Sequence, residues 1–82
     1  MTTLYLDASR YSTARELHAA LKAMLSLPEY YGMNADALHD CLSERREPVS
    51  LWIASAGEGD VARAVSSVCA VVADLGGSVR EL

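Results

Sequence analysis

The chain has 82 residues, 51% of them hydrophobic and 22% charged, and its formal net charge is −4 at pH 7. This balance excludes a disordered chain, and the length predicts one small domain over residues 1–82 that buries about 60% of its unfolded surface. The acidic excess disfavours nucleic-acid binding, because phosphate neutralisation needs clustered Lys and Arg. No apolar run reaches membrane-spanning length, and the first residues lack a signal-peptide pattern. We therefore expect a soluble cytoplasmic domain.

The first half of the chain predicts a strand followed by two helices. Residues 4–6 form a short apolar run typical of a strand. Thr13 and Glu16 form a capping box at the start of a helix. Pro28 ends that helix, and Asn34 is a good N-cap for the next one. The apolar stripe of the first helix comprises Leu17, Ala20, Leu21, Met24 and Leu25.

On a helical wheel the second helix divides into two faces. One face is apolar and comprises Ala35, Leu38, Cys41 and Leu42. The other face is polar and comprises Asp36, His39, Asp40 and Ser43. This segregation predicts a surface helix whose polar face is open to solvent.

The second half of the chain predicts a buried strand, a third helix and a final strand. Residues 49–53 are β-branched and aromatic, as in a buried strand. Asp60 is the expected N-cap of the third helix, Gly76 its left-handed stop, and residues 78–82 a last short strand. The core face of this helix comprises Val61, Val65, Val68, Cys69, Val72 and Leu75. Helices between strands favour parallel pairing, so the predicted fold class is α/β: a small two-layer domain with a three-stranded parallel sheet and helices packed mainly on one side.

The two cysteines, Cys41 and Cys69, both fall on apolar helix faces. A disulfide between them is the alternative. We interpret them as small buried hydrophobic residues in a reducing compartment.

Three kinds of side chain in this sequence could in principle carry chemistry: carboxylates, histidines and cysteines. Asp36, His39 and Asp40 could ligate a metal, but nothing in the sequence completes the coordination shell. Asp36 and Asp40 lack the apolar burial that an acid–base pair needs. His18 on the first helix is expected to be either solvated or at the edge of the core. The sequence therefore predicts no catalysis, no metal and no cofactor, and on their own the two carboxylates could simply belong to a solvated helix face.

The loop before the second helix favours a binding surface. Tyr30 and Tyr31 stand where the chain must turn, and tyrosine is frequent at interfaces because it offers a rigid face with a polar tip. Gly32 permits backbone conformations that bring main-chain groups close to a partner. The alternative is that one or both tyrosines fill the core between the first two helices.

Residues 27–42 closely resemble the barstar family of intracellular inhibitors of secreted bacterial guanyl-specific ribonucleases. The match runs without a gap through Leu-Pro-Glu-Tyr-Tyr-Gly-x-Asn-x-Asp-Ala-Leu-x-Asp-Cys-Leu, where x marks positions 33, 35 and 39. The resemblance implies a barstar-like fold, no enzymatic activity of its own, and a 1:1 complex with such a ribonuclease. A barstar-like binding module for another partner, a different nuclease toxin or a non-nuclease protein, is the alternative.

In that family the tyrosine-glycine loop and the second helix enter the nuclease active site. The resemblance implies that Asp40 takes the place of a substrate phosphate and that Asp36 pairs with another basic residue of the enzyme. The full set implied for partner binding is Tyr30, Tyr31, Gly32, Asn34, Ala35, Asp36, His39, Asp40 and Glu44.

Some positions depart from barstar. His39 stands where barstar has tryptophan, and Met33 stands where it has glutamate. Val71 lies near the position of an acidic contact, with Asp74 the only carboxylate close by. The predicted nuclease is therefore an enzyme of the same broad class other than barnase, and His39 is expected at its interface, where protonation would weaken binding to a cationic site.

The rest of the chain aligns with the family by pattern only, with residues 48–53 as the middle strand, and this alignment assigns Ile53 to the core face of that strand. Trp52 should then point to the side of the sheet that the helices leave open, and Tyr5 is a candidate for the same side. An exposed aromatic pair on a small sheet would be a candidate patch for self-association.

Overall fold

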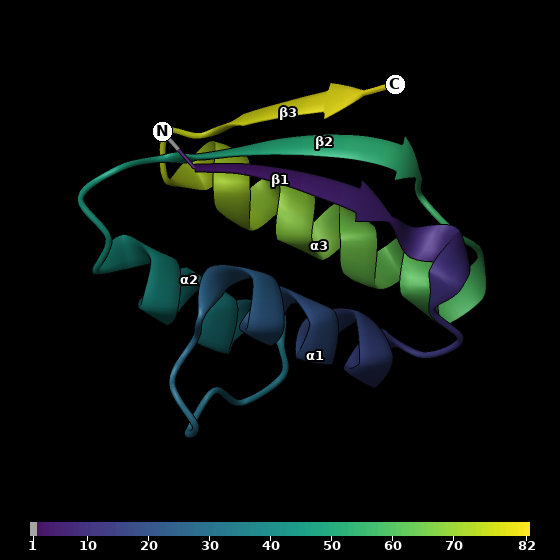
Figure 1. The fold of residues 1–82 in the computed structure, drawn as a ribbon, viewed down its shortest axis with the longest axis horizontal. Coiled ribbons are helices and arrows are strands. Elements are labelled where there is room, and N and C mark those ends of the chain that lie inside the picture. Colours follow the sequence, from purple (N-terminus) through teal and green to yellow (C-terminus); the bar gives the residue numbers. More distant parts are fainter. Residues whose placement is uncertain (1) are drawn as a thin grey trace.

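The computed structural model describes residues 2–82, which form three α-helices, one 3₁₀ helix and three strands (Figure 1). The elements in chain order are β1 (Thr2–Asp7), η1 (Ala8–Arg10), α1 (Ala14–Leu25), α2 (Ala35–Ser43), β2 (Val49–Ser55), α3 (Gly59–Asp74) and β3 (Ser78–Glu81). The predicted order of strands and helices is confirmed, and η1 is an addition that the sequence did not predict. In the described part of the chain, no helix is both long and apolar enough to cross a bilayer.

The sheet is entirely parallel, with the strand order β1-β2-β3. Leu4 pairs with Leu51 and Leu6 with Ile53, and these side chains are buried on one face of the sheet. Figure 1 shows all three α-helices on that side, so the predicted two-layer α/β fold is confirmed.

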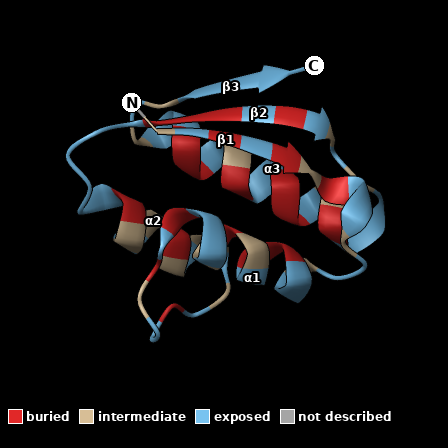
Figure 2. Ribbon diagram, in the orientation of Figure 1, coloured by how far each residue is buried: buried red, intermediate tan, exposed pale blue. Residues whose placement is uncertain are grey.

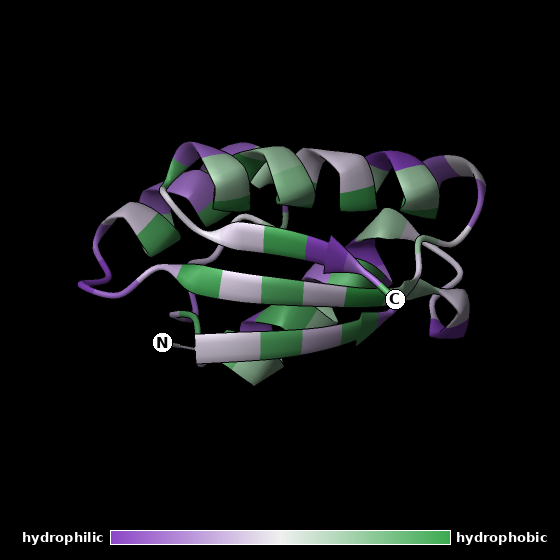
Figure 3. Cartoon of the chain, turned by 90° about the horizontal axis from the view of Figure 1, so that it is seen from above, coloured by the Kyte–Doolittle hydropathy of each residue, from purple (hydrophilic) through white to green (hydrophobic). Residues whose placement is uncertain are grey.

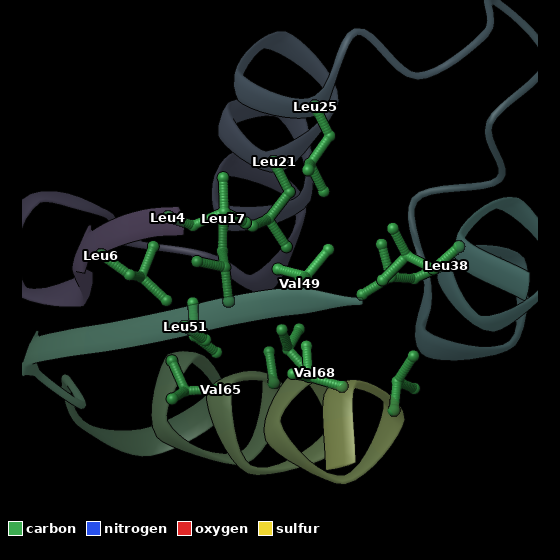
Figure 4. Close-up of a cluster of buried hydrophobic side chains, with 14 of the residues drawn as sticks. Leu4, Leu6, Leu17, Leu21, Leu25, Leu38, Val49, Leu51, Val65 and Val68 are labelled. Carbon is green, nitrogen blue, oxygen red and sulfur yellow. The ribbon is translucent and has the colours of Figure 1, made fainter. Parts of the chain in front are cut away.

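The core lies between this sheet face and the helices (Figure 2). Leu17 and Leu21 of α1 and Leu51 of β2 are completely buried, and the close-up in Figure 4 shows that α1, α2 and α3 all contribute side chains to this cluster. Each buried Leu or Val side chain stabilises the fold by roughly 1.5–3 kcal/mol relative to an exposed one. Met24, which the apolar stripe of α1 included, is exposed instead.

The helix starts follow the predicted caps at two of three places. Thr13 Oγ1 accepts a hydrogen bond from the Glu16 amide at 3.1 Å, while Glu16 Oε1 accepts from the Ser12 amide at 3.2 Å. Asn34 caps α2 as predicted. The prediction for α3 was wrong, because its N-cap is Glu58, whose side chain makes no capping hydrogen bond.

Asp60 lies within the first turn of α3 and not at its cap. There it forms an ion pair with Arg63 at 2.9 Å, and its charge lies near the positive end of the helix dipole. The sequence could not distinguish these positions, since Asp is favourable at both.

The end of α3 is the left-handed stop that the sequence predicted. Gly76 has φ +83°, its amide donates to the Ala73 carbonyl, and the Gly77 amide donates to the Val72 carbonyl. This pair of hydrogen bonds is a Schellman motif and satisfies carbonyls that the helix end leaves free.

Cys41 and Cys69 are free thiols, each half-buried at the edge of the core. Burial raises the pKa of both thiols above the usual value. The predicted apolar environment is therefore confirmed, although neither side chain is completely enclosed.

The side of the sheet away from the helices carries the aromatic residues. Ile53 is buried, whereas Trp52 is 39% and its strand neighbour Tyr5 61% exposed. The prediction that Trp52 points to the open face is confirmed, and Tyr5 lies directly beside it.

Candidate functional site

The loop between α1 and α2 turns its two tyrosines in opposite directions. α1 ends at Leu25, and its C-cap Ser26 has φ 52°. The Tyr31 amide donates to the Pro28 carbonyl at 2.9 Å to close a turn. Tyr30 is 80% exposed, whereas Tyr31 is only 4% exposed. One tyrosine thus fills the core, which was one of the two alternatives, and the other stays at the surface.

Tyr31 is fixed by a buried hydrogen bond to α1. Its hydroxyl lies 2.6 Å from His18 Nδ1, and the two ring centroids are 5.9 Å apart. The expectation that His18 is solvated was wrong, since it is 4% exposed. The Tyr31 hydroxyl gives the buried His18 Nδ1 atom a hydrogen-bond partner, so the usual free-energy penalty for burying a polar group is avoided.

Burial also changes the acidity of both groups. It raises the pKa of Tyr31 to about 12, with a further contribution from the charge of Cys41, and it lowers the pKa of His18. At neutral pH the pair therefore consists of a neutral imidazole and a neutral phenol.

This pair predicts that acid destabilises the fold. An unfolded histidine titrates at about pH 6.5, and folded His18 titrates lower, so the unfolded chain binds more protons. The contribution of His18 is fully present above about pH 6.5 and is lost as the pH falls below that value. We expect the free energy of unfolding, measured with urea between about pH 7 and about pH 5, to fall less in His18→Gln than in the wild type. Parallel pH profiles would contradict this role.

Gly32, Met33 and Asn34 connect the loop to the start of α2. The residue with positive φ in this loop is Met33, at 56°, and not Gly32, while the close approach of the Gly32 main chain to a partner stays a prediction. The space beside Gly32 is tight, since a Cβ there would lie 3.3 Å from the Ala37 Cβ. Asn34 Oδ1 accepts from the Ala37 amide at 2.8 Å and its Nδ2 donates to the Gly32 carbonyl at 3.1 Å. One side chain thus caps the helix and fixes the loop.

The polar face of α2 carries two carboxylates without partners. Asp36 and Asp40 are exposed, and among residues 2–82 neither side chain has an ion pair or hydrogen bond. Glu44, the C-cap residue, is exposed at the end of the same helix, and Ala35 is half-buried at its start. The face is therefore open to a cationic partner.

His39 connects this face to α3. Its Nε2 lies 3.0 Å from Asp74 Oδ2 at the end of α3, and both side chains are partly exposed. From the sequence, Asp74 could be identified only as the one carboxylate close to Val71. The structure places it directly against His39.

A metal site does not form from these groups. Across residues 2–82, no three His, Cys, Asp or Glu side chains come close enough together to hold a metal ion. The Nε2 atom of His39 contacts Asp74 Oδ2 at 3.0 Å.

The fold and this face together define a small α/β domain that presents a rigid acidic helix and an exposed tyrosine, an arrangement suited to binding a protein with a cationic surface. The chain belongs to the barstar family: residues 1–80 match the family described as Barstar (barnase inhibitor). It is also 42% identical over 43 residues to the "Putative ribonuclease inhibitor YrdF" of Bacillus subtilis (strain 168). That match covers 52% of this chain and 47% of the relative, so the chain spans about half the length of the curated protein it matches.

Sequence reasoning missed His18 as a residue that supports the site, although a signal was present. His18, Leu21 and Leu25 follow one another at helical spacing, and all three are buried. A polar residue at such a position points to a buried partner, which here is Tyr31.

Proposed function

We propose that this protein is an inhibitor that blocks the active site of a secreted guanyl-specific bacterial ribonuclease. The observation that carries the proposal is the pair Asp36 and Asp40, exposed and unpartnered one turn apart on α2, with the exposed ring of Tyr30 in the loop that leads into this helix. Membership of the barstar family and the name of the Bacillus subtilis relative support the same function.

The physical basis is competition for a phosphate site. A ribonuclease active site holds substrate phosphate with cationic side chains, so a carboxylate in a fixed position can take the place of the phosphate. Asn34 caps α2, and the buried Tyr31 anchors the loop, so the surface is already ordered before binding. Binding then costs little conformational entropy, and the charge of the acidic face accelerates encounter.

The proposed contacts follow the implied set of residues, with two different roles. Tyr30, Asp36 and Asp40 present exposed side chains to the enzyme, and His39 and Glu44 lie at the side and end of the same helix. Main-chain groups at Gly32, Asn34 and Ala35 adjoin them. Tyr31 acts from the core, where it positions the loop. We propose a 1:1 complex, in the cytoplasm of the producing cell.

Inhibition of purified secreted ribonucleases tests this function. We expect RNA cleavage by a guanyl-specific ribonuclease to stop at a 1:1 molar ratio of inhibitor to enzyme, and a ribonuclease of different base specificity to serve as control. Capture of a DNA-cleaving toxin or a non-nuclease protein, without inhibition of any guanyl-specific ribonuclease, would favour the alternative of a binding module for another partner.

His39 provides a second test of the same interface. A protonated imidazole would face an already cationic site, so we expect affinity for the ribonuclease to fall on acidification in the wild type and less in His39→Gln. Because His39 Nε2 already meets Asp74 Oδ2 at 3.0 Å, the difference between the two proteins should be only a few-fold. Superimposable profiles would show that His39 has no such role.

A further inference from the structure

The open face of the sheet carries one side chain from each strand in a straight row. Tyr5 of β1 pairs with Trp52 of β2, and Trp52 pairs with Arg80 of β3. All three side chains are exposed. Figure 3 looks onto this face, where no helix covers the three strands.

The row has a chemical order from one sheet edge to the other: a phenol, an indole and a guanidinium. Arg80 Cζ lies over the Trp52 ring, 5.9 Å from its centroid. A guanidinium is planar, so the side of Arg80 that faces away from Trp52 remains available to a second aromatic ring.

The next row of the same face is small and polar. Thr3, Ser50 and Ser78 follow in register across the three strands, and the hydroxyls of Ser50 and Ser78 are 3.1 Å apart. Neither row contains a carboxylate, although the chain as a whole carries a net charge of −4. Two copies of this face can therefore approach without the repulsion that their acidic helices would cause.

We propose that the open face binds a second copy of this chain, sheet against sheet, about a two-fold axis that runs parallel to the strands and passes over β2. Such an axis places β1 of one copy opposite β3 of the other. Tyr5 then faces Arg80 of the second copy, and this contact occurs twice. A two-fold axis at right angles to the strands would instead place each Arg80 against the other Arg80, so the order of the row selects the first arrangement.

The size of the face limits the strength of this dimer. Three strands spaced about 4.8 Å apart give a face only about 15 Å wide, which belongs with the small interfaces of transient complexes. We therefore infer a reversible dimer that forms with rising concentration. The helices lie on the other side of the sheet, so the acidic face of α2 stays open in both copies and the dimer does not depend on the proposed inhibition.

Trp52 is the only tryptophan in the chain and lies at the centre of the proposed contact, so tryptophan fluorescence reports directly on formation of the dimer. We expect the emission maximum to move to shorter wavelengths, and the weight-average mass from sedimentation equilibrium to rise toward that of a dimer, over the same range of concentration from micromolar to millimolar. A mass that stays monomeric, or a dimer without any change in Trp52 emission, would overturn the proposal.

Two substitutions at one position test the axis. Tyr5→Lys would place a cation opposite Arg80 of the second copy, so we expect dimerisation to weaken by about tenfold or more. Tyr5→Glu would place an anion there, so dimerisation should persist or strengthen. Ser67→Lys and Ser67→Glu make the same charge changes at an exposed position of α3 and should leave the dimerisation constant unchanged.

The comparison of the two Tyr5 variants is decisive when thermal unfolding shows that both are folded. Equal weakening by Tyr5→Lys and Tyr5→Glu would contradict the proposed pairing of Tyr5 with Arg80. Equal changes in the Ser67 variants would show that net charge, and not this face, controls association.

Discussion

Replacing Asp40 by alanine is expected to abolish most inhibition of the cognate ribonuclease, with a loss of several powers of ten in affinity and an unchanged melting temperature. The Asp40 carboxylate is exposed and has no partner within residues 2–82, so the folded protein alone gains little from it. In the complex it would form charge-assisted hydrogen bonds in a water-poor cleft. Its removal would leave enzyme cations buried and unpaired, which costs roughly 2–5 kcal/mol or more.

Two further alanine variants provide the comparison for Asp40. Asp36→Ala should lose less affinity, since Asp36 is proposed to pair with a second basic residue beside the phosphate site. Glu58→Ala also removes one negative charge, but at the start of α3, and it should retain wild-type inhibition. The measurement is the inhibition constant from RNA cleavage, with thermal unfolding of each variant. An Asp40→Ala protein that inhibits like the wild type would exclude the active-site mechanism.

The local features of this fold could be predicted because they depend on neighbours in the sequence. Asn34 caps α2 through an amide three residues away, and the two faces of α2 follow from helical spacing alone. The exposed position of Trp52 follows from the alternation of β2 once Ile53 is assigned to the core. The acidic face of α2, the central part of the site, could therefore be predicted from the sequence.

The remaining features depend on contacts between distant parts of the chain. The direction of Tyr31 depends on His18, 13 residues earlier on α1, and the environment of His39 depends on Asp74, 35 residues later on α3. Sequence periodicity does not encode such pairs, so the sequence alone could not decide whether Tyr30 and Tyr31 lie in the core or at the surface. The row of Tyr5, Trp52 and Arg80 likewise depends on the register between strands, which the sequence did not determine.

The two neighbouring tyrosines should respond to alanine substitution in opposite ways. Tyr31→Ala removes a buried ring and leaves His18 Nδ1 without its hydroxyl partner, so we expect a loss of about 3–5 kcal/mol in the free energy of unfolding. This is a large part of the stability of a domain of this size, for which roughly 0.05–0.15 kcal/mol per residue is typical. Tyr30→Ala removes an exposed ring, so it should change stability by no more than about 0.5 kcal/mol and lower affinity for the ribonuclease.

Urea unfolding and ribonuclease inhibition, measured on both variants, separate the two roles. Tyr31→Phe is the matched control, because it keeps the buried ring and removes only the hydroxyl that meets His18 and, at 3.5 Å, the Asn34 carbonyl. It should lose less stability than Tyr31→Ala and should retain inhibition wherever it is folded, since the ring still anchors the loop. If Tyr30→Ala destabilised the fold as much as Tyr31→Ala, the two rings would share the core in solution. The exposed aromatic contact proposed for the ribonuclease would then have to come from another residue.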